Sequence, residues 1–259
     1  NTHINNFMNT ITLFRSNTIY LPWLQILLTI AAVAGVWFMP SLQLFAISLC
    51  LYFLIGCFGI SIGYHRYLAH KSFEFRWSWL QWPCLLLGCL AGTGSPLGWV
   101  AVHREHHRHS DRPGDPHSPH TIGYKSLIAN YHYEWNKWPI RDIISNKAQR
   151  LIHDYYFLII LSWIAFWAVM GFNLLLYIVI LPMVLAVWAS TISNYINHKF
   201  GYINYNSVDQ SKNCWYTAYL TFGEGWHNNH HARPKDYRFG KKWWELDLGA
   251  ALIESVLKK

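Results

Sequence analysis

Histidine is the residue type in this sequence whose grouping points most directly to chemistry. The chain has 259 residues and 15 histidines, and nine of these lie in the short words GYHRYLAH, HREHH, NYINH and HNNHH. The nine are His65, His70, His103, His106, His107, His198, His227, His230 and His231. Imidazole is a good ligand for iron, copper and zinc, whereas magnesium and calcium prefer oxygen ligands. The pattern therefore predicts a metal site, and nine imidazoles are more than one octahedral ion can bind, so we expect two ions.

The spacing of the histidines indicates how helices would direct them. Residues three and four apart lie on one face of an α-helix, so we expect the three imidazoles of HREHH to meet at one point, and those of HNNHH likewise. Asn194 and His198 in NYINH are one turn apart and form a further element of the site. His65 and His70 are five residues apart. Either the helix ends between them or they approach the site from different sides.

The elements that carry these clusters are marked by missing charges. Residues 16–65 and 155–198 contain no Asp, Glu, Lys or Arg. A membrane span needs about 20 apolar residues, so each stretch predicts a helical hairpin, with spans at about 21–39, 42–63, 155–171 and 174–196. Two buried hairpins of a soluble protein are the alternative, which is disfavoured because such helices would carry a polar stripe. Residues 77–102 are also uncharged, but prolines and glycines interrupt them, and we expect a helix at the membrane interface rather than a span.

Composition and charge agree with a membrane protein. The chain is 53% hydrophobic and 13% charged, against roughly a quarter charged in soluble domains. Its net charge of +8 does not indicate nucleic-acid binding, because the charges are too few to cover a soluble surface. All 21 basic residues lie outside the two hairpins, and neither turn within a hairpin carries one. The positive-inside rule then places the N-terminal, middle and C-terminal segments in the cytoplasm.

These observations predict an all-α integral membrane protein that forms a single domain over residues 1–259. Four transmembrane helices in two hairpins would carry a cytoplasmic helical cap, made of residues 64–154 and 197–259, with the metal site on the cytoplasmic side. We expect a multi-pass protein of a bacterial inner membrane rather than of the endoplasmic reticulum. A histidine-rich metal transporter is the rival class. It is disfavoured because it would need ligands at mid-membrane depth, where neither hairpin has a histidine.

The histidine clusters resemble the three histidine boxes of the membrane fatty acid desaturases, over nearly the whole chain. The flanking words GYHRYLAHKSF, GWVAVHREHHRHSDRPGDPHSP and GEGWHNNHHARP are similar to those of the delta-9 acyl-CoA or acyl-lipid type. Alkane and carotenoid hydroxylases share the boxes more loosely. A membrane di-iron hydroxylase of an acyl, alkyl or carotenoid substrate is therefore the alternative.

The resemblance implies that the cap holds a di-iron centre, with two irons cycling between Fe2+ and Fe3+. The nine histidines and a water ordered by Asn194 would bind them. O2 would be the co-substrate, and a cis double bond, at delta-9, would enter a fatty acyl thioester or an acyl lipid within the membrane. No b-type cytochrome domain, dinucleotide glycine fingerprint or ferredoxin cysteine cluster is recognisable. Electrons would come from a separate donor, a ferredoxin or a b-type cytochrome with its reductase.

Further residues beside the boxes have candidate roles. Carboxylates often accept a hydrogen bond from the outer nitrogen of a histidine ligand, and the candidates are Asp111, Asp115 and Glu224. The equal alternative is that these three are solvated loop carboxylates. In the family, matching positions line a hydrophobic tunnel for the acyl chain, and here they are Phe53, Cys57, Trp99 and Ser190, with Phe53 as the floor. For each of the four, plain helix packing is the alternative.

Overall fold

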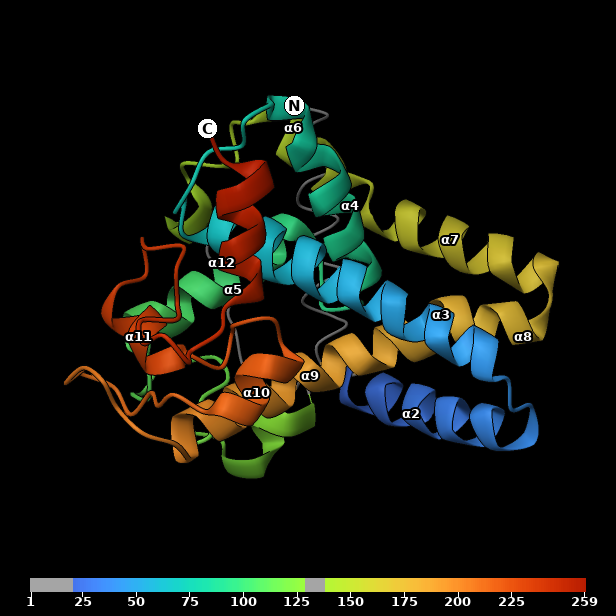
Figure 1. The fold of residues 1–259 in the computed structure, drawn as a ribbon. Helices are drawn as coiled ribbons and strands as arrows, with labels where there is room; N and C mark the ends of the chain where they lie inside the picture. Colours follow the sequence, from blue (N-terminus) through green and yellow to red (C-terminus); the bar gives the residue numbers. More distant parts are fainter. Residues whose placement is uncertain (1–20, 129–137) are drawn as a thin grey trace.

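The structure is a computed structural model that describes residues 21–128 and 138–259. Within these ranges it is helical, with isolated β-bridges but no β-strand. Long apolar helices extend to one side, and short helices and loops gather at the other as a cap (Figure 1). The all-helical part of the expected fold is confirmed.

The first long hairpin is built from the first uncharged stretch. Helix α2 (Leu21–Phe38) is followed by α3 (Leu42–Phe53), which continues without interruption as the π-type helix η1 (Leu54–Ala69). Ser41 begins α3, and its hydroxyl oxygen accepts a hydrogen bond from the backbone N–H of Leu44 (3.3 Å). This capping fixes the turn at the place where Pro40 and Ser41 interrupt the apolar sequence.

The second long hairpin follows the same plan. Helix α7 (Tyr156–Met170) ends at Gly171, whose φ of 127° suits glycine at a sharp turn. The chain then returns as one continuous helix made of α8 (Phe172–Leu174), η5 (Leu175–Ile180) and α9 (Leu181–Lys199).

The number of candidate membrane spans can be judged from the length and composition of the helices. Two helices in the described ranges, Leu42–Ala69 and Phe172–Lys199, are long and apolar enough to cross a membrane. A third is added if α6 (Lys147–Asp154) and α7, which meet at a bend of 53°, count as one span. Helix α2 is apolar but has only 18 residues.

Both long helices extend further into the cap than the sequence predicts. The expected spans ended at residues 63 and 196, where polar residues begin, whereas the helices end at Ala69 and Lys199. The reason is that hydropathy marks only the part of a helix that faces lipid. The extra turns carry His65 and His198 from the spans into the cap.

The uncharged residues 77–102 form a short 3-10 turn, one α-helix and the first half of another rather than one span. Helix α4 (Gln81–Leu90) has ten residues, about 15 Å of helix, which is half of a 30 Å hydrocarbon core. It packs closely on η1, since a Cβ on Gly59 would lie 2.5 Å from the backbone nitrogen of Gly88. The chain turns at Gly92 and Gly94, both with positive φ, before α5 (Pro96–His109) begins.

Short helices complete the cap. They are η2 (Ser78–Leu80), η3 (Gly123–Ile128), η4 (Trp138–Ile140), α10 (Trp215–Leu220), α11 (His227–Ala232), α12 (Leu248–Leu252) and η6 (Ile253–Leu257). Arg66 of η1 ties the beginning of α12, which Asp247 caps, to the long helices. Its guanidinium is fully buried, 3.8 Å from the ring centroid of Phe239, and it pairs with Glu224 (2.6 Å) and Asp247 (2.9 Å).

Candidate metal centre

The nine clustered histidines come together in two adjacent groups. Helices η1, α5, α9 and α11 carry them, apart from His70, which caps the end of η1. A five-histidine group contains His65, His70, His103, His107 and His230, and a four-histidine group contains His106, His198, His227 and His231. Within each group, one nitrogen of every ring lies within 4.8 Å of the others. The groups adjoin, since the rings of His107 and His231 are stacked with centroids 4.3 Å apart.

Each histidine triplet is divided between the two groups, which corrects the expectation that its three rings meet at one point. His103 and His107 join the five-histidine group and His106 the four-histidine group, while α11 sends His230 to the first and His227 and His231 to the second. The reason is helical geometry. At about 100° per residue, the position four along is turned by about 40° to one side and the position three along by about 60° to the other, so these two positions diverge by about 100°. One helix therefore contributes histidines to both groups.

The helix ends at Ala69, between His65 and His70, as one of the two expectations had it, yet both rings reach the same group. The backbone N–H of His70 donates to the carbonyl oxygen of His65 (3.1 Å), a hydrogen bond that spans five residues. In a π-type turn of this kind, residues five apart lie nearly one above the other. Both rings therefore enter the same group, with centroids 5.0 Å apart.

The three candidate carboxylates each lie against the outer nitrogen of a clustered histidine. Nδ1 of His106 is 2.9 Å from Asp115, Nδ1 of His198 is 2.8 Å from Asp111, and Nδ1 of His65 contacts Glu224. A fourth such pair was not anticipated, because Asp209 lies 2.6 Å from Nδ1 of His231. Asp209 stands alone in the loop after the last long helix, and nothing in its immediate sequence singles it out.

The histidine groups fit two transition-metal ions. A ring whose Nδ1 donates to a carboxylate has its lone pair on Nε2, which is the form that binds a metal. In the described part of the chain, Nε2 of His106 and Nε2 of His231 are buried and have no hydrogen-bond partner. Ring nitrogens of other members, such as Nε2 of His70 and Nε2 of His103, are only 2.8 Å apart. Orphaned and converging imidazole nitrogens are what an ion between them would satisfy.

Burial keeps the clustered imidazoles neutral, which is the form that can bind a metal. It lowers the pKa of His103, His107 and His230 well below the usual value, and neighbouring imidazoles lower it further. Burial also lowers the pKa of His231 to about 4, although its hydrogen bond to Asp209 acts in the opposite direction. Burial alone would raise the pKa of Asp209, but the hydrogen bond and charge of His231 outweigh it, so that pKa is lowered. Near neutral pH these rings are uncharged and Asp209 is ionised.

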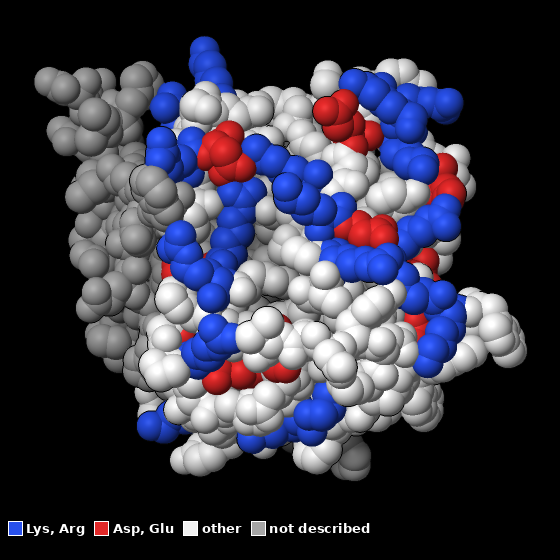
Figure 2. Space-filling view, turned by 90° about the vertical axis from the view of Figure 1, so that its left-hand side faces the viewer, with Lys and Arg blue, Asp and Glu red and all other residues white. Residues whose placement is uncertain are grey.

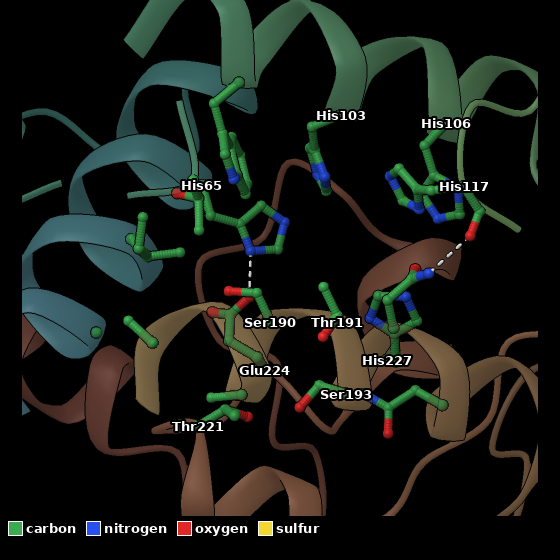
Figure 3. A pocket seen from close by; sticks show the side chains of 18 of the residues that line it. His65, His103, His106, His117, Ser190, Thr191, Ser193, Thr221, Glu224 and His227 are labelled. Carbon is green, nitrogen blue, oxygen red and sulfur yellow. Dashed lines mark hydrogen bonds and ion pairs between the residues drawn. The ribbon is translucent and has the colours of Figure 1, made fainter. Parts of the chain in front are cut away.

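A pocket opens beside both histidine groups (Figure 3). Its polar end includes His65 and His103 from one group and His106 and His227 from the other. Its other walls come from η1, α3, α9 and the segment after α10. These lining residues include Tyr52, Gly56, Ile60, Ala186, Ala189, Thr221 and Phe222.

Two of the four expected tunnel residues line this pocket. Trp99 and Ser190 are in its walls, and the Trp99 ring also stacks on His103 at 4.8 Å. Phe53 and Cys57 are not brought to the lining. They pack instead in a core cluster that includes Phe73, Phe75 and Cys84. One residue of helical rotation separates them from Tyr52 and Gly56, which do face the pocket.

Asn194 and His117 form a pair at the pocket wall that links α9 to the loop after α5. Nδ2 of Asn194 donates to the backbone oxygen of His117 (3.0 Å), which leaves Oδ1 as the other polar atom of that amide (Figure 3). The ring of His117 stacks on His106 with centroids 4.4 Å apart. His117 is not among the nine clustered histidines that the sequence singles out. Its place in the word DPHSP beside HREHH is the signal that could have placed it in the pocket.

Comparisons with known proteins show which sequences this chain is similar to. The model of the fatty acid desaturase family matches residues 42–259. A sn-1 stearoyl-lipid 9-desaturase from Anabaena variabilis is 36% identical over 209 residues, 78% of this chain and 76% of that protein. A sn-2 palmitoyl-lipid 9-desaturase from Nostoc sp. (strain 36) is 34% identical over 249 residues, 90% and 86% of the two chains. A hex-5-enoyl-[acyl-carrier protein] acetylenase from Moorena producens (strain JHB) is 30% identical over 265 residues, which cover 89% of this chain and 79% of that protein.

Proposed function

The chain belongs to the fatty acid desaturase family and is a fatty acyl desaturase, and we propose that it introduces a cis double bond at delta-9 of an acyl lipid. The observation that best supports this proposal concerns one pocket. It has histidines of both groups at one end and walls of Tyr52, Ile60 and Phe222 further along. An acyl chain in such a pocket would present its methylene groups directly to the metal centre.

The reaction explains why the site is built from imidazoles rather than from an acid and a base. It converts two adjacent methylene groups, O2, two electrons and two protons into an alkene and two waters. An unactivated C–H bond offers no group for a side chain to polarise. Two irons bound by the nine histidines would supply the oxygen activation that removes the hydrogens.

The residues of the chain would contribute placement. The carboxylates of Asp111, Asp115, Asp209 and Glu224 hold the rings of four ligands, which fixes the tautomer that binds a metal. We propose that Oδ1 of Asn194 orders a water toward the four-histidine group. The apolar walls would hold the chain and exclude bulk water, so that the carbons to be desaturated lie closest to the centre.

Acyl-lipid substrates and delta-9 selectivity are proposed from the relatives. The matches from Anabaena and Nostoc are named as lipid 9-desaturases. The match from Moorena is named for an acyl-carrier-protein substrate, so an acyl thioester is the competing carrier. Supplying the purified protein with stearate on a glycerolipid, on coenzyme A and on acyl carrier protein would separate the three. A hydroxy product would instead indicate a hydroxylase.

The membrane arrangement follows from the charges and the long helices. We propose that α2 and α7 complete a set of four spans with the helices Leu42–Ala69 and Phe172–Lys199, and that the cap faces the cytoplasm of a bacterial inner membrane. A cysteine introduced at Asn173 should react with an impermeant thiol reagent added from outside, whereas one at Lys258 should not. Reaction of both from the same side would overturn this topology.

A separate electron donor is proposed to meet the end of the cap that points away from the long helices. Lysine and arginine side chains are spread over this face (Figure 2). Positive charge of this kind favours encounter with an acidic protein, as a ferredoxin or a b-type cytochrome would be. Turnover driven by such a donor should slow as the salt concentration rises, because salt screens the attraction.

The metal centre can be tested by its stoichiometry. We expect about two irons per chain, because the histidines divide into two groups. His106→Ala and His230→Ala each remove a ligand from one group, and each should abolish product while the protein stays in the membrane. One iron per chain, or product from both variants, would contradict the proposal.

A further inference from the structure

Helix α10 exposes aromatic and aliphatic side chains at the boundary between the cap and the long helices (Figure 1). Residues 213–223 contain no charged residue. One face of the helix is buried through Thr217 and Ala218, whereas Leu220 is 66% exposed and Trp215 59% exposed. An apolar face of this kind is unusual on the water-exposed surface of a cap.

A second segment adds to this surface. Residues 243–248 follow two lysines and include Trp243, which is 91% exposed. The segment is joined to α10, since the hydroxyl of Tyr219 donates to the backbone oxygen of Trp244 (3.2 Å). We call the exposed residues of both segments the aromatic anchor, namely Trp215, Tyr216, Tyr219, Leu220, Trp243, Leu246 and Leu248.

The aromatic anchor is fixed at membrane depth by its contacts with the first long hairpin. The hydroxyl of Tyr52 in α3 donates to the backbone oxygen of Leu220 (2.7 Å). Phe222, two residues further on, packs on the rings of Tyr52 and Phe53 with centroids 5.4 Å apart in each case. Tyr52 lies ten residues along the helix from Leu42, about 15 Å, within a hydrocarbon core about 30 Å thick. The end of α10 therefore contacts a part of this helix that lies within that core.

The composition of this surface matches a bilayer interface. Tryptophan and tyrosine concentrate where hydrocarbon meets headgroups, because their rings are apolar and their N–H or O–H groups are polar. Lys242 directly precedes Trp243 and would lie among anionic headgroups. The backbone of α10 is helical, so it can enter an apolar environment without leaving its own polar groups unpaired.

We propose that the aromatic anchor seats the cap in the cytoplasmic leaflet of the lipid bilayer, as an in-plane attachment in addition to the membrane spans. Helix α10 runs directly into Thr221 and Phe222, which line the pocket. The attachment therefore sets the height of the pocket relative to the acyl chains of that leaflet. The inference depends on the contacts of the cap with the long helices and does not require that the chemistry be desaturation.

Spin labels at single cysteines test this surface in the full-length protein in lipid nanodiscs. The background is Cys50→Ser, since the other four cysteines are buried. Labels at Trp243→Cys and Leu220→Cys are compared with Val33→Cys on the exposed side of α2 and with Val208→Cys, which is 85% exposed on a cap loop. Collision with O2 reports lipid, and collision with a water-soluble nickel chelate reports water.

The proposal predicts that the labels at 243 and 220 collide preferentially with O2, as the label at 33 does, while the label at 208 collides with the nickel chelate. If the label at 220 perturbs the fold, Leu246→Cys replaces it. The proposal would be overturned if the label at 243 and its companion, at 220 or at 246, were as accessible to the nickel chelate as the label at 208. Spin–spin coupling between chains with protection from both reagents would assign the surface to a second copy instead.

Discussion

Asp209 accepts a hydrogen bond from His231, with its Oδ2 atom 2.6 Å from Nδ1 of the ring. The other pairs of this kind are Asp111 with His198, Asp115 with His106 and Glu224 with His65. Three of the four carboxylates therefore support the four-histidine group, and only one supports the five-histidine group. Glu224 is moreover balanced by the buried charge of Arg66. Negative charge is concentrated around the four-histidine group, which favours the binding of a cation there.

Asp209→Asn tests the importance of the carboxylate in the loop. The substitution removes the acceptor charge that fixes His231, and loss of such a partner typically weakens metal binding by about 10- to 100-fold. When the variant is treated with a chelator, one of its two irons should be lost before the other. Elemental analysis of the iron that remains per chain would follow this loss. Asp236→Asn is the matched control, because Asp236 pairs with Lys241 rather than with a clustered histidine. Equal retention of both irons in Asp209→Asn and wild type would contradict this role.

Arg66→Met tests the buried charge cluster beside His65. The arginine is fully buried and pairs with Glu224 and Asp247, so its removal leaves two carboxylates without their cation. Breaking a buried pair in this way costs about 3–5 kcal/mol. The apparent unfolding temperature in detergent should fall clearly. Arg238→Met, which removes an exposed partner of Glu254, should change it little. Similar unfolding temperatures for the two variants would show that the cluster contributes no stability.

The metal-free protein should lose stability when the pH falls below neutral. Burial lowers the pKa of His231 to about 4 and that of His117 to about 3, from a usual value of 6.5. Between these values and 6.5 the unfolded chain binds more protons than the folded one, so acidification favours unfolding. The unfolding temperature of the metal-free protein should therefore be lower at pH 5 than at pH 7. An equal or higher unfolding temperature at pH 5 would contradict the burial of neutral rings.

Tyr52→Ala tests which face of the first long hairpin meets the acyl chain. Tyr52 lines the pocket, and its truncation makes room for further methylene groups, each worth about 0.8 kcal/mol of burial. The preferred substrates should become longer by a few carbons, with the double bond at the same distance from the carboxyl group. Cys57→Ala is the control, because Cys57 is buried outside the lining. A shift in Cys57→Ala but not in Tyr52→Ala would mean that the chain follows the face implied by the family resemblance.

Much of the arrangement could be predicted because it is local in the sequence. The absence of charge over 16–65 and 155–198 marks both hairpins, since lipid-facing helices cannot carry charges on most of their surface. The histidine words mark the candidate ligands, because residues of one helical turn are close together in the sequence. Asp111, Asp115 and Glu224 could be predicted because each lies within eight residues of one of these words.

The remaining features depend on contacts between distant segments. Asp209 meets His231 across 22 residues of sequence, and no local pattern indicates which loop carboxylate will reach which ring. The division of each histidine triplet between the two groups depends on the positions of the neighbouring helices that carry the other histidines. Which face of α3 and η1 turns to the pocket likewise involves a distant segment, since Phe222 packs on the ring of Tyr52.

The position of the double bond made by this chain tests the central claim most directly. The wild-type protein, His106→Ala and His230→Ala are expressed in a host that lacks its own desaturase, and mass spectrometry locates double bonds in its glycerolipids and its acyl thioesters. The account predicts a cis double bond at delta-9 that accumulates first in the glycerolipids of cells with the wild-type protein, and none with either variant. No new double bond, hydroxylated acyl chains in its place, or product from both variants would contradict it.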